Sequence, residues 1–120
     1  MYFKRSSFIL VNFDSNLTAT SIEAINLAIN VEKQLKIRVF GKVQGVWYRQ
    51  STKDKAEMLN LRGVVLNEAD GSVYIEVRGQ ETDLDDFVVF CKIGPVKAKV
   101  ENVILEEMEL TDFRGFSIIR

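Results

Sequence analysis

Nine consecutive residues, Gly41 to Arg49, combine the residue types that bind a small oxyanion. They read G-K-V-Q-G-V-W-Y-R and lie between an alternating segment and a segment typical of a helix. Glycines allow the backbone to approach an anion closely, and the first amides of a helix lack intrahelical partners. Arg49 adds a planar guanidinium that can donate two hydrogen bonds to phosphate oxygens. The segment therefore indicates a phosphate site, with Arg49 joined by the backbone amides of Gln44, Gly45, Val46, Trp47, Tyr48 and Arg49 itself.

Glycine spacing alone leaves a second interpretation open, because two glycines around a turn are ordinary turn chemistry. The segment is also not a Walker A loop, since Gly45 is not followed by the Lys-Ser or Lys-Thr pair that holds nucleotide phosphates and magnesium. It does not match the G-x-G-x-x-G dinucleotide pattern either.

Asn67 is the second residue that could contribute chemistry. It ends the apolar run Val64 to Leu66, and the Asp70-Gly71 pair then reverses the chain into a second alternating segment at 73–77. An asparagine before a turn also has a plain structural explanation, since its side chain commonly hydrogen-bonds nearby backbone.

Taken together, G-K-V-Q-G-V-W-Y-R and G-V-V-L-N-E-A-D-G-S-V closely resemble the acylphosphatase family. The resemblance covers most of residues 35–120. It implies an enzyme that hydrolyses an acyl phosphate, a carboxylic-phosphoric mixed anhydride, to carboxylate and phosphate. Arg49 and the amides of residues 44–49 would hold the phosphoryl group, Asn67 would position the attacking water, and no metal or other cofactor would be needed.

These roles suit the side chains concerned. Arg49 and backbone amides can neutralise charge on a phosphoryl group, and Asn67 can orient a water but cannot take its proton. No general base is evident in the sequence. An acyl phosphate tolerates that absence, because its carboxylate is a good leaving group and its loose transition state requires mainly positioning and electrostatic stabilisation.

The composition excludes several other classes of site. The 120 residues fit one domain, and 47% of them are hydrophobic. There is no histidine, and Cys91 is the only cysteine, so common zinc sites, Ser-His or Cys-His catalysis and an intramolecular disulfide are excluded. The net charge of −1 gives no general attraction to nucleic acid or membrane, but residues 35–62 carry +5 and residues 63–120 carry −6.

Residues 1–34 form an N-terminal extension to the domain expected at 35–120. A helix is plausible at 20–34, with Ile22, Ile25 and Ile29 on one stripe. An appended helix, an arm that forms an oligomer and an upstream start codon remain open explanations. The apolar run at 8–11 is interrupted by Asn12 and lacks a convincing cleavage site, which predicts a cytoplasmic protein.

The remaining pattern predicts a ferredoxin-like βαββαβ domain: an antiparallel sheet with two helices on one face and a short C-terminal strand. Alternation predicts strands around 35–39 and 73–77, and apolar residues in 100–105 and 116–118 supply the last strands. Helices are expected at about 49–59 and from Thr82 to the Gly94-Pro95 pair.

Finer predictions concern helix ends and aromatic residues. The Ser51/Asp54 and Thr82/Asp85 pairs have capping-box spacing, and Asn60 suits the left-handed position after a helix. Cys91 should be a core residue. Trp47 and Tyr48 could wall the site, but packing of both against the sheet is favoured because buried area dominates aromatic energetics.

The residues also bear on several rival functions. The R-G-F motif at 114–116 lacks the second aromatic pair expected for RNA recognition, and a calcium loop starting at Asp83 would put valine where glycine is required. The amino-terminal domain of a hydrogenase-maturation carbamoyl transferase shows similar motifs, but this chain is too short for that enzyme's further domains. A non-catalytic module that binds a small anion or a protein is the remaining alternative. The sequence does not identify the acyl group of the substrate.

Overall fold

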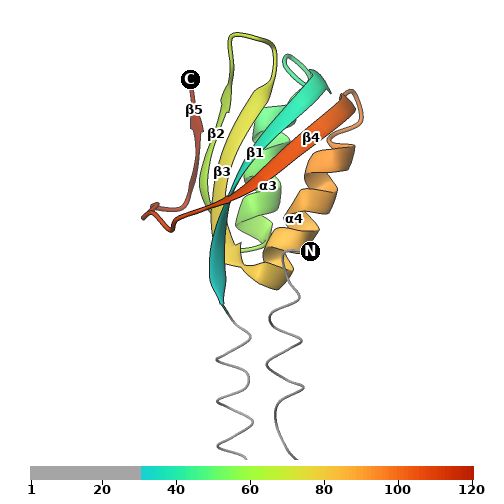
Figure 1. The fold of residues 1–120 in the computed structure, drawn as a ribbon. Coiled ribbons are helices and arrows are strands. Elements are labelled where there is room, and N and C mark those ends of the chain that lie inside the picture. The colour runs from blue at the N-terminus through green and yellow to red at the C-terminus, as the bar shows by residue number, and fades with distance from the viewer. Residues whose placement is uncertain (1–30) are drawn as a thin grey trace, which may run out of the picture. The chain divides into compact units, whose positions relative to one another are not determined.

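The computed structural model describes residues 31–120, which form a five-stranded sheet covered on one face by two helices (Figure 1). The strand order is β4-β1-β3-β2-β5. In chain order the elements are β1 (Glu32–Lys42), α3 (Tyr48–Met58), β2 (Arg62–Asn67), β3 (Val73–Gln80), α4 (Glu81–Ile93), β4 (Lys99–Met108) and β5 (Phe116–Ile119). The predicted ferredoxin-like fold is confirmed.

The sequence predicts a short C-terminal strand but not the direction in which it pairs with the sheet. Strand β5 pairs in parallel with β2, from Gly63 opposite Phe116 to Leu66 opposite Ile119, so the sheet is mixed. The chain leaves β4 at one edge and returns as β5 at the other edge (Figure 1). Alternation in sequence gives the faces of a strand but not the direction of its neighbour, so only the structure shows this parallel pairing.

The core lies between the sheet and the helices. Alternate residues of β1 and β3 are fully buried there, as the sequence pattern predicts: Leu35, Ile37, Val39, Val73, Ile75 and Val77. Leu84, Phe87 and Cys91 of α4 pack against this face and are also fully buried, which confirms the core position of Cys91. Burial raises the pKa of the Cys91 thiol to about 12, so it stays protonated at neutral pH.

Strand β1 begins at Glu32, three residues before the expected domain boundary. Residues 32–34 therefore belong to the sheet and not to a helix; the rest of the helix expected at 20–34 lies outside the described residues, apart from Val31. Lys33 forms an ion pair with Glu81 at the start of α4 (N–O 3.7 Å), and both side chains are buried. Gln34 accepts a hydrogen bond from the Thr111 amide (2.7 Å). These contacts make the start of β1 part of the folded domain.

Both predicted capping boxes are wrong. Helix α3 starts at Tyr48, so Ser51 lies inside it, and α4 starts at Glu81 after the extended residue Gln80; neither helix has a side-chain cap. The first residue of each helix, Tyr48 or Glu81, is buried against the rest of the domain, a tertiary contact that a local spacing rule does not include. Asn60 does adopt the left-handed conformation expected after a helix (φ 57°).

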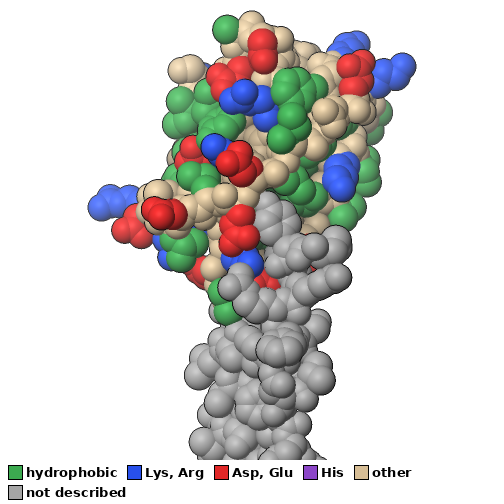
Figure 2. Space-filling model, in the orientation of Figure 1, with side chains coloured by type: hydrophobic (Ala, Val, Ile, Leu, Met, Phe, Trp, Pro, Cys, Tyr) green, Lys and Arg blue, Asp and Glu red, His purple; other side chains and the backbone are tan. Residues whose placement is uncertain are grey.

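The sheet face opposite the helices carries charged groups of both signs. Figure 2 shows acidic and basic side chains next to one another on this face, with apolar side chains between them. Among them, Lys36 pairs with Glu106 (3.5 Å) and Arg38 with Glu68 (3.2 Å). No helix within residues 31–120 is long and apolar enough to cross a membrane.

Candidate active site

The turn before α3 has an unusual backbone conformation of the kind found at functional sites. Trp47, directly before the helix, has a positive φ of 71°, a conformation that is costly for a bulky residue. The first intrahelical bond of this end runs from the Ser51 amide to the Trp47 carbonyl (3.1 Å). The amides of Tyr48, Arg49 and Gln50 precede it, and no side chain caps them, so they are suited to an anion.

Trp47 and Tyr48 have opposite environments. Tyr48 is 1% exposed, and its hydroxyl donates to the Cys91 carbonyl of α4 (2.7 Å), so the packing prediction is confirmed for this residue. Burial raises the pKa of Tyr48, which therefore stays neutral. Trp47 is 73% exposed, and the packing prediction is wrong for it. At this left-handed turn the side chains of Trp47 and Tyr48 point in different directions, one into solvent and one into the core. The buried Tyr48 anchors the start of α3 to α4.

Asn67 lies at the end of β2, where the β2–β3 turn begins, and Gln44 ties this turn to the loop before α3. The Gln44 side-chain amide donates to the carbonyls of Glu68 (2.8 Å) and Ser72 (2.9 Å). Asp70 closes the turn by accepting bonds from the amide and hydroxyl of Ser72 (2.9 and 2.6 Å). These hydrogen bonds hold the pKa of the exposed Asp70 carboxyl below its usual range. Gln44 thus fixes the turn beside Asn67 relative to the loop that leads into α3, whose first turn carries Arg49.

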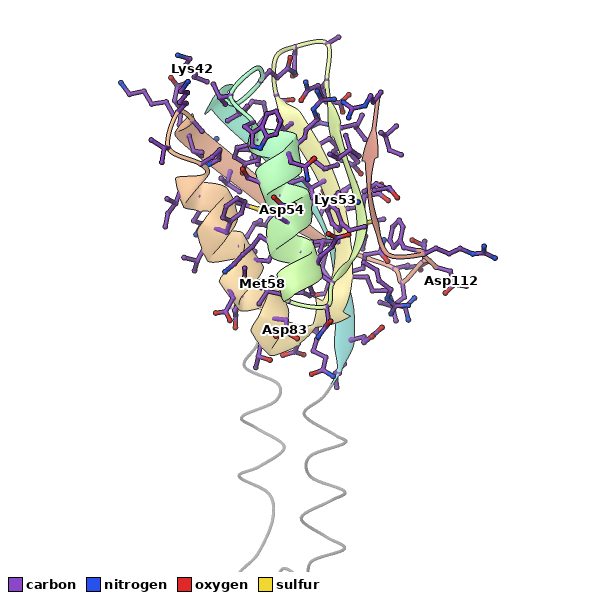
Figure 3. The ribbon with its side chains drawn as sticks, turned by 180° about the vertical axis from the view of Figure 1, so that it is seen from behind. Lys42, Lys53, Asp54, Met58, Asp83 and Asp112 are labelled. Carbon is purple, nitrogen blue, oxygen red and sulfur yellow. The ribbon has the colours of Figure 1, made fainter. Side chains whose placement is uncertain are left out.

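A cavity of about 240 Å³ lies between the α3 turn and the ends of β2 and β5. Its lining includes Arg49 and Asn67, the two side chains to which the sequence assigned chemistry, together with Gly45, Trp47 and Tyr48 of the predicted cradle. Gln44 and Val46 do not line it: the Gln44 side chain makes the bonds described above, and Val46 is buried. Only their backbone amides were predicted to contribute. Figure 3 shows this end of the molecule near Lys42, opposite the end marked by Met58 and Asp83.

Two polar groups of this cavity lack partners among residues 31–120, whereas Tyr48 and Gln50 of the lining do form hydrogen bonds. In the described part of the chain, Asn67 Oδ1 is the only buried side-chain oxygen or nitrogen without a hydrogen bond. Arg49 has no ion pair or side-chain hydrogen bond with any residue of 31–120. An unpaired buried oxygen costs free energy of about 1 to 3 kcal/mol unless a bound molecule satisfies it. A water or ligand in the cavity would satisfy this oxygen.

Sequence reasoning missed four lining residues: Val43, Gln50, Ile118 and Arg120. Val43 and Gln50 flank the predicted cradle directly. Ile118 and Arg120 reach the cavity because β5 runs parallel to β2, and the register that sets Leu66 opposite Ile119 brings Arg120 beside Asn67. No local pattern in the sequence signals that pairing.

A larger cavity of about 350 Å³ lies over the open sheet face and contains none of the predicted site residues. Its main charges already have partners, since Arg38 pairs with Glu68 and stacks on the Tyr74 ring (5.4 Å), and Lys36 pairs with Glu106. Burial raises the pKa of Tyr74 to about 12. A surface with satisfied charges is a weaker candidate for chemistry than the smaller cavity with unpaired groups.

Comparison with known proteins gives a consistent result. Residues 35–118 match the family model described as Acylphosphatase. The chain is 44% identical over 86 residues to an acylphosphatase of Acaryochloris marina. The aligned residues cover 72% of this chain and 92% of that protein. The solved acylphosphatase of Bacillus subtilis aligns with a TM-score of 0.72 and 36% identity over 73% of this chain and 99% of that one.

A structure of full-length HypF also resembles the domain, with a TM-score of 0.71 and 31% identity. The alignment covers 75% of this chain but only 12% of the HypF chain. The two acylphosphatases therefore align with this chain over nearly their whole length, whereas HypF aligns over a small part of its length.

Proposed function

This chain belongs to the acylphosphatase family of hydrolases, and on that premise we propose that the cavity beside Arg49 and Asn67 is where it hydrolyses acyl phosphates. The observation that carries the assignment is the meeting of three features in one cavity. These are an unpaired guanidinium, an uncapped helix start and a buried amide oxygen without a partner.

In the proposed mechanism, the phosphoryl group binds at the start of α3. Arg49 donates two hydrogen bonds to its oxygens, and the backbone amides of residues 44–49 complete the cradle. These donors are fixed before the substrate arrives, because Tyr48 anchors the helix start to α4. Fixed donors stabilise charge in the transition state without the cost of reorganisation.

Asn67 Oδ1 accepts a hydrogen bond from the attacking water and holds it in line with the bond that breaks. The water oxygen forms a bond to phosphorus while the bond from phosphorus to the acyl oxygen breaks, and the bonding electrons leave with the carboxylate. The proton of the water passes to bulk solvent or to the phosphate product, since Asn67 cannot accept it.

No metal is assigned a role in this proposal. The described lining has no carboxylate, thiol or imidazole side chain, and within residues 31–120 no group of three His, Cys, Asp or Glu side chains is placed to hold a metal ion. Arg49 supplies the positive charge that a metal ion supplies in many phosphoryl-transfer enzymes.

The test is a hydrolysis assay with benzoyl phosphate beside 4-nitrophenyl phosphate. We expect turnover of the acyl phosphate and not of the monoester, because the site offers no group to assist a poor leaving group. Turnover of neither would favour the alternative of a non-catalytic module that binds a small anion or a protein, and turnover of both would indicate a general phosphatase.

A further inference from the structure

A second guanidinium, that of Arg120, also lines the cavity. The proposed phosphate site gives it no role. Arg120 follows β5 directly and lines the cavity together with Ile118. Like Arg49, it has no ion pair or side-chain hydrogen bond with any residue of 31–120. The described lining therefore presents two guanidinium groups without partners among residues 31–120, and none of these lining residues has an acidic side chain.

The position of Arg120 follows from the parallel pairing of β5 with β2. Gly63, Val65 and Asn67 alternate on the same strand, and Val65 is fully buried against the helices. The paired residues of β5 show the same alternation: Phe116 is buried, and Ile118 and Arg120 line the cavity. Because alternate residues share one face, Asn67 and Arg120 lie on the helix side of neighbouring strands at the same end of the sheet.

Arg49 comes from a different direction, the first turn of α3. A phosphoryl group held by Arg49 and the helix amides has Asn67 on the side of the strand ends, and Arg120 lies beyond Asn67 on the outer strand. The exposed ring of Trp47 also lines this cavity and gives an apolar surface for the body of an acyl group. The space next to the phosphate site thus combines an apolar wall with a cation.

We propose that Arg120 is a specificity-determining residue that binds an anionic group on the acyl end of the substrate. The substrate class would be acyl phosphates whose acyl group carries a second negative charge, such as a carboxylate or phosphate. This inference rests on the proposed function, because it takes the phosphate end to be held by Arg49. An exposed cation paired with one substrate anion typically changes affinity by about 2- to 5-fold, and salt reduces the effect.

The experiment compares kcat/KM for benzoyl phosphate with that for 3-carboxybenzoyl and 4-carboxybenzoyl phosphate. The two isomers place the carboxylate at different distances from the phosphoryl group, and the isomer with the higher kcat/KM is used. The wild type should prefer it over benzoyl phosphate, and Arg120→Gln should lower that preference by about 2- to 5-fold. Arg114→Gln is the matched control, since it removes one exposed positive charge outside the cavity and should leave the preference unchanged. Raising the salt concentration should reduce the preference of the wild type.

Two results would overturn the proposal while leaving the proposed function intact. One is a wild type without preference for either carboxylated substrate. The other is an Arg120→Gln variant that loses the same factor on all three substrates, which would place Arg120 at the phosphate or in the structure. If the wild type hydrolyses none of the three compounds, the proposed function itself fails, so the two failures are distinguishable.

Discussion

At the scale of single residues, the proposed site depends on two side chains with no charge partner or hydrogen-bond partner among residues 31–120. Arg49 and Asn67 come from different elements, and each is left with an unsatisfied group where the cavity forms. Native proteins rarely leave buried polar atoms unpaired, so such an atom in a cavity points to a bound molecule. The two residues should fail in different ways when they are changed.

Arg49→Ala should reduce kcat/KM for benzoyl phosphate by about a thousandfold or more and abolish inhibition by phosphate, because it removes the main donor to the phosphoryl oxygens. Arg49→Lys should recover little, since a point charge cannot reproduce a planar two-pronged contact. Lys42→Ala is the control: Lys42 lies in the same motif but does not line the cavity, and it should retain activity. Near-native activity and phosphate affinity in Arg49→Ala would show that the cradle is elsewhere.

Asn67→Ala should lower kcat by about 100-fold or more, while the inhibition constant of inorganic phosphate changes little, because water positioning matters in the transition state and not for holding the anion. Steady-state kinetics with phosphate as inhibitor give both numbers. Asn102→Ala, at an exposed position of β4, serves as control. A parallel loss of rate and phosphate affinity would instead place Asn67 in the phosphate cradle.

At the scale of elements, the important unit is the pair of turns that Gln44 connects. Its two hydrogen bonds join the loop before α3 to the β2–β3 turn, so the distance between Arg49 and Asn67 depends on a side chain that lines no part of the cavity. Tyr48 and Trp47 make the other contribution at this scale. One is buried against α4, and the other takes the strained left-handed conformation that ends the loop.

Gln44→Leu keeps the backbone amide but removes both side-chain bonds. We expect kcat to fall by about tenfold and the inhibition constant of phosphate to change less, because Arg49 and the amides remain while Asn67 loses its fixed position. The free energy of unfolding should fall by about 1 to 3 kcal/mol, the net value of two hydrogen bonds. Urea unfolding and inhibition kinetics check the two parts. A loss of stability without a change in kcat would leave Gln44 with a purely structural role.

Gly63 shows how closely β2 and β3 pack. It has a φ of 155°, and an added Cβ would overlap the backbone carbonyl of Glu76. Gly63→Ala should therefore lower the free energy of unfolding by about 2 to 4 kcal/mol. Gly71→Ala is the matched control, because Gly71 also has a positive φ (94°) but open space around it, and its cost should be about 1 kcal/mol. Equal losses in urea unfolding would contradict the packing argument.

At the scale of the whole molecule, residues 33–120 form a compact unit that the family model covers almost completely. The lining of its cavity has no acidic, histidine or cysteine side chain to bind a metal. We therefore expect activity to persist after exhaustive chelation with EDTA, followed by assay in metal-free buffer. Loss of turnover that added metal restores would contradict the proposed mechanism.

Removal of residues 1–30 should likewise preserve kcat/KM, because every residue with a proposed role lies beyond Glu32. The cut must precede β1, since Lys33 and Gln34 form contacts with α4 and with Thr111. Circular dichroism and thermal unfolding give a readout of folding separate from the hydrolysis assay. A folded truncation without hydrolysis would show that the extension builds part of the site.

The sequence by itself determined the family and located most of the residues of the proposed site, because the relevant information is local. The glycines, Arg49 and the following helix lie within one short stretch, and Asn67 lies directly before a turn that the Asp70-Gly71 pair specifies. Alternation and helical spacing also predicted the core and the ferredoxin-like layers. These features depend on residues only a few positions apart, so sequence spacing reports them directly.

Only the tertiary structure decided the features that depend on contacts between segments far apart in the sequence. The parallel alignment of β5 with β2 brings Arg120 to the cavity, although it lies far from Arg49 in the chain. Packing, and not side-chain caps, set both helix starts, and the left-handed turn at Trp47 left that ring exposed while Tyr48 became buried. Such outcomes follow from how elements fit against one another, and a local pattern does not contain the energy of that fit.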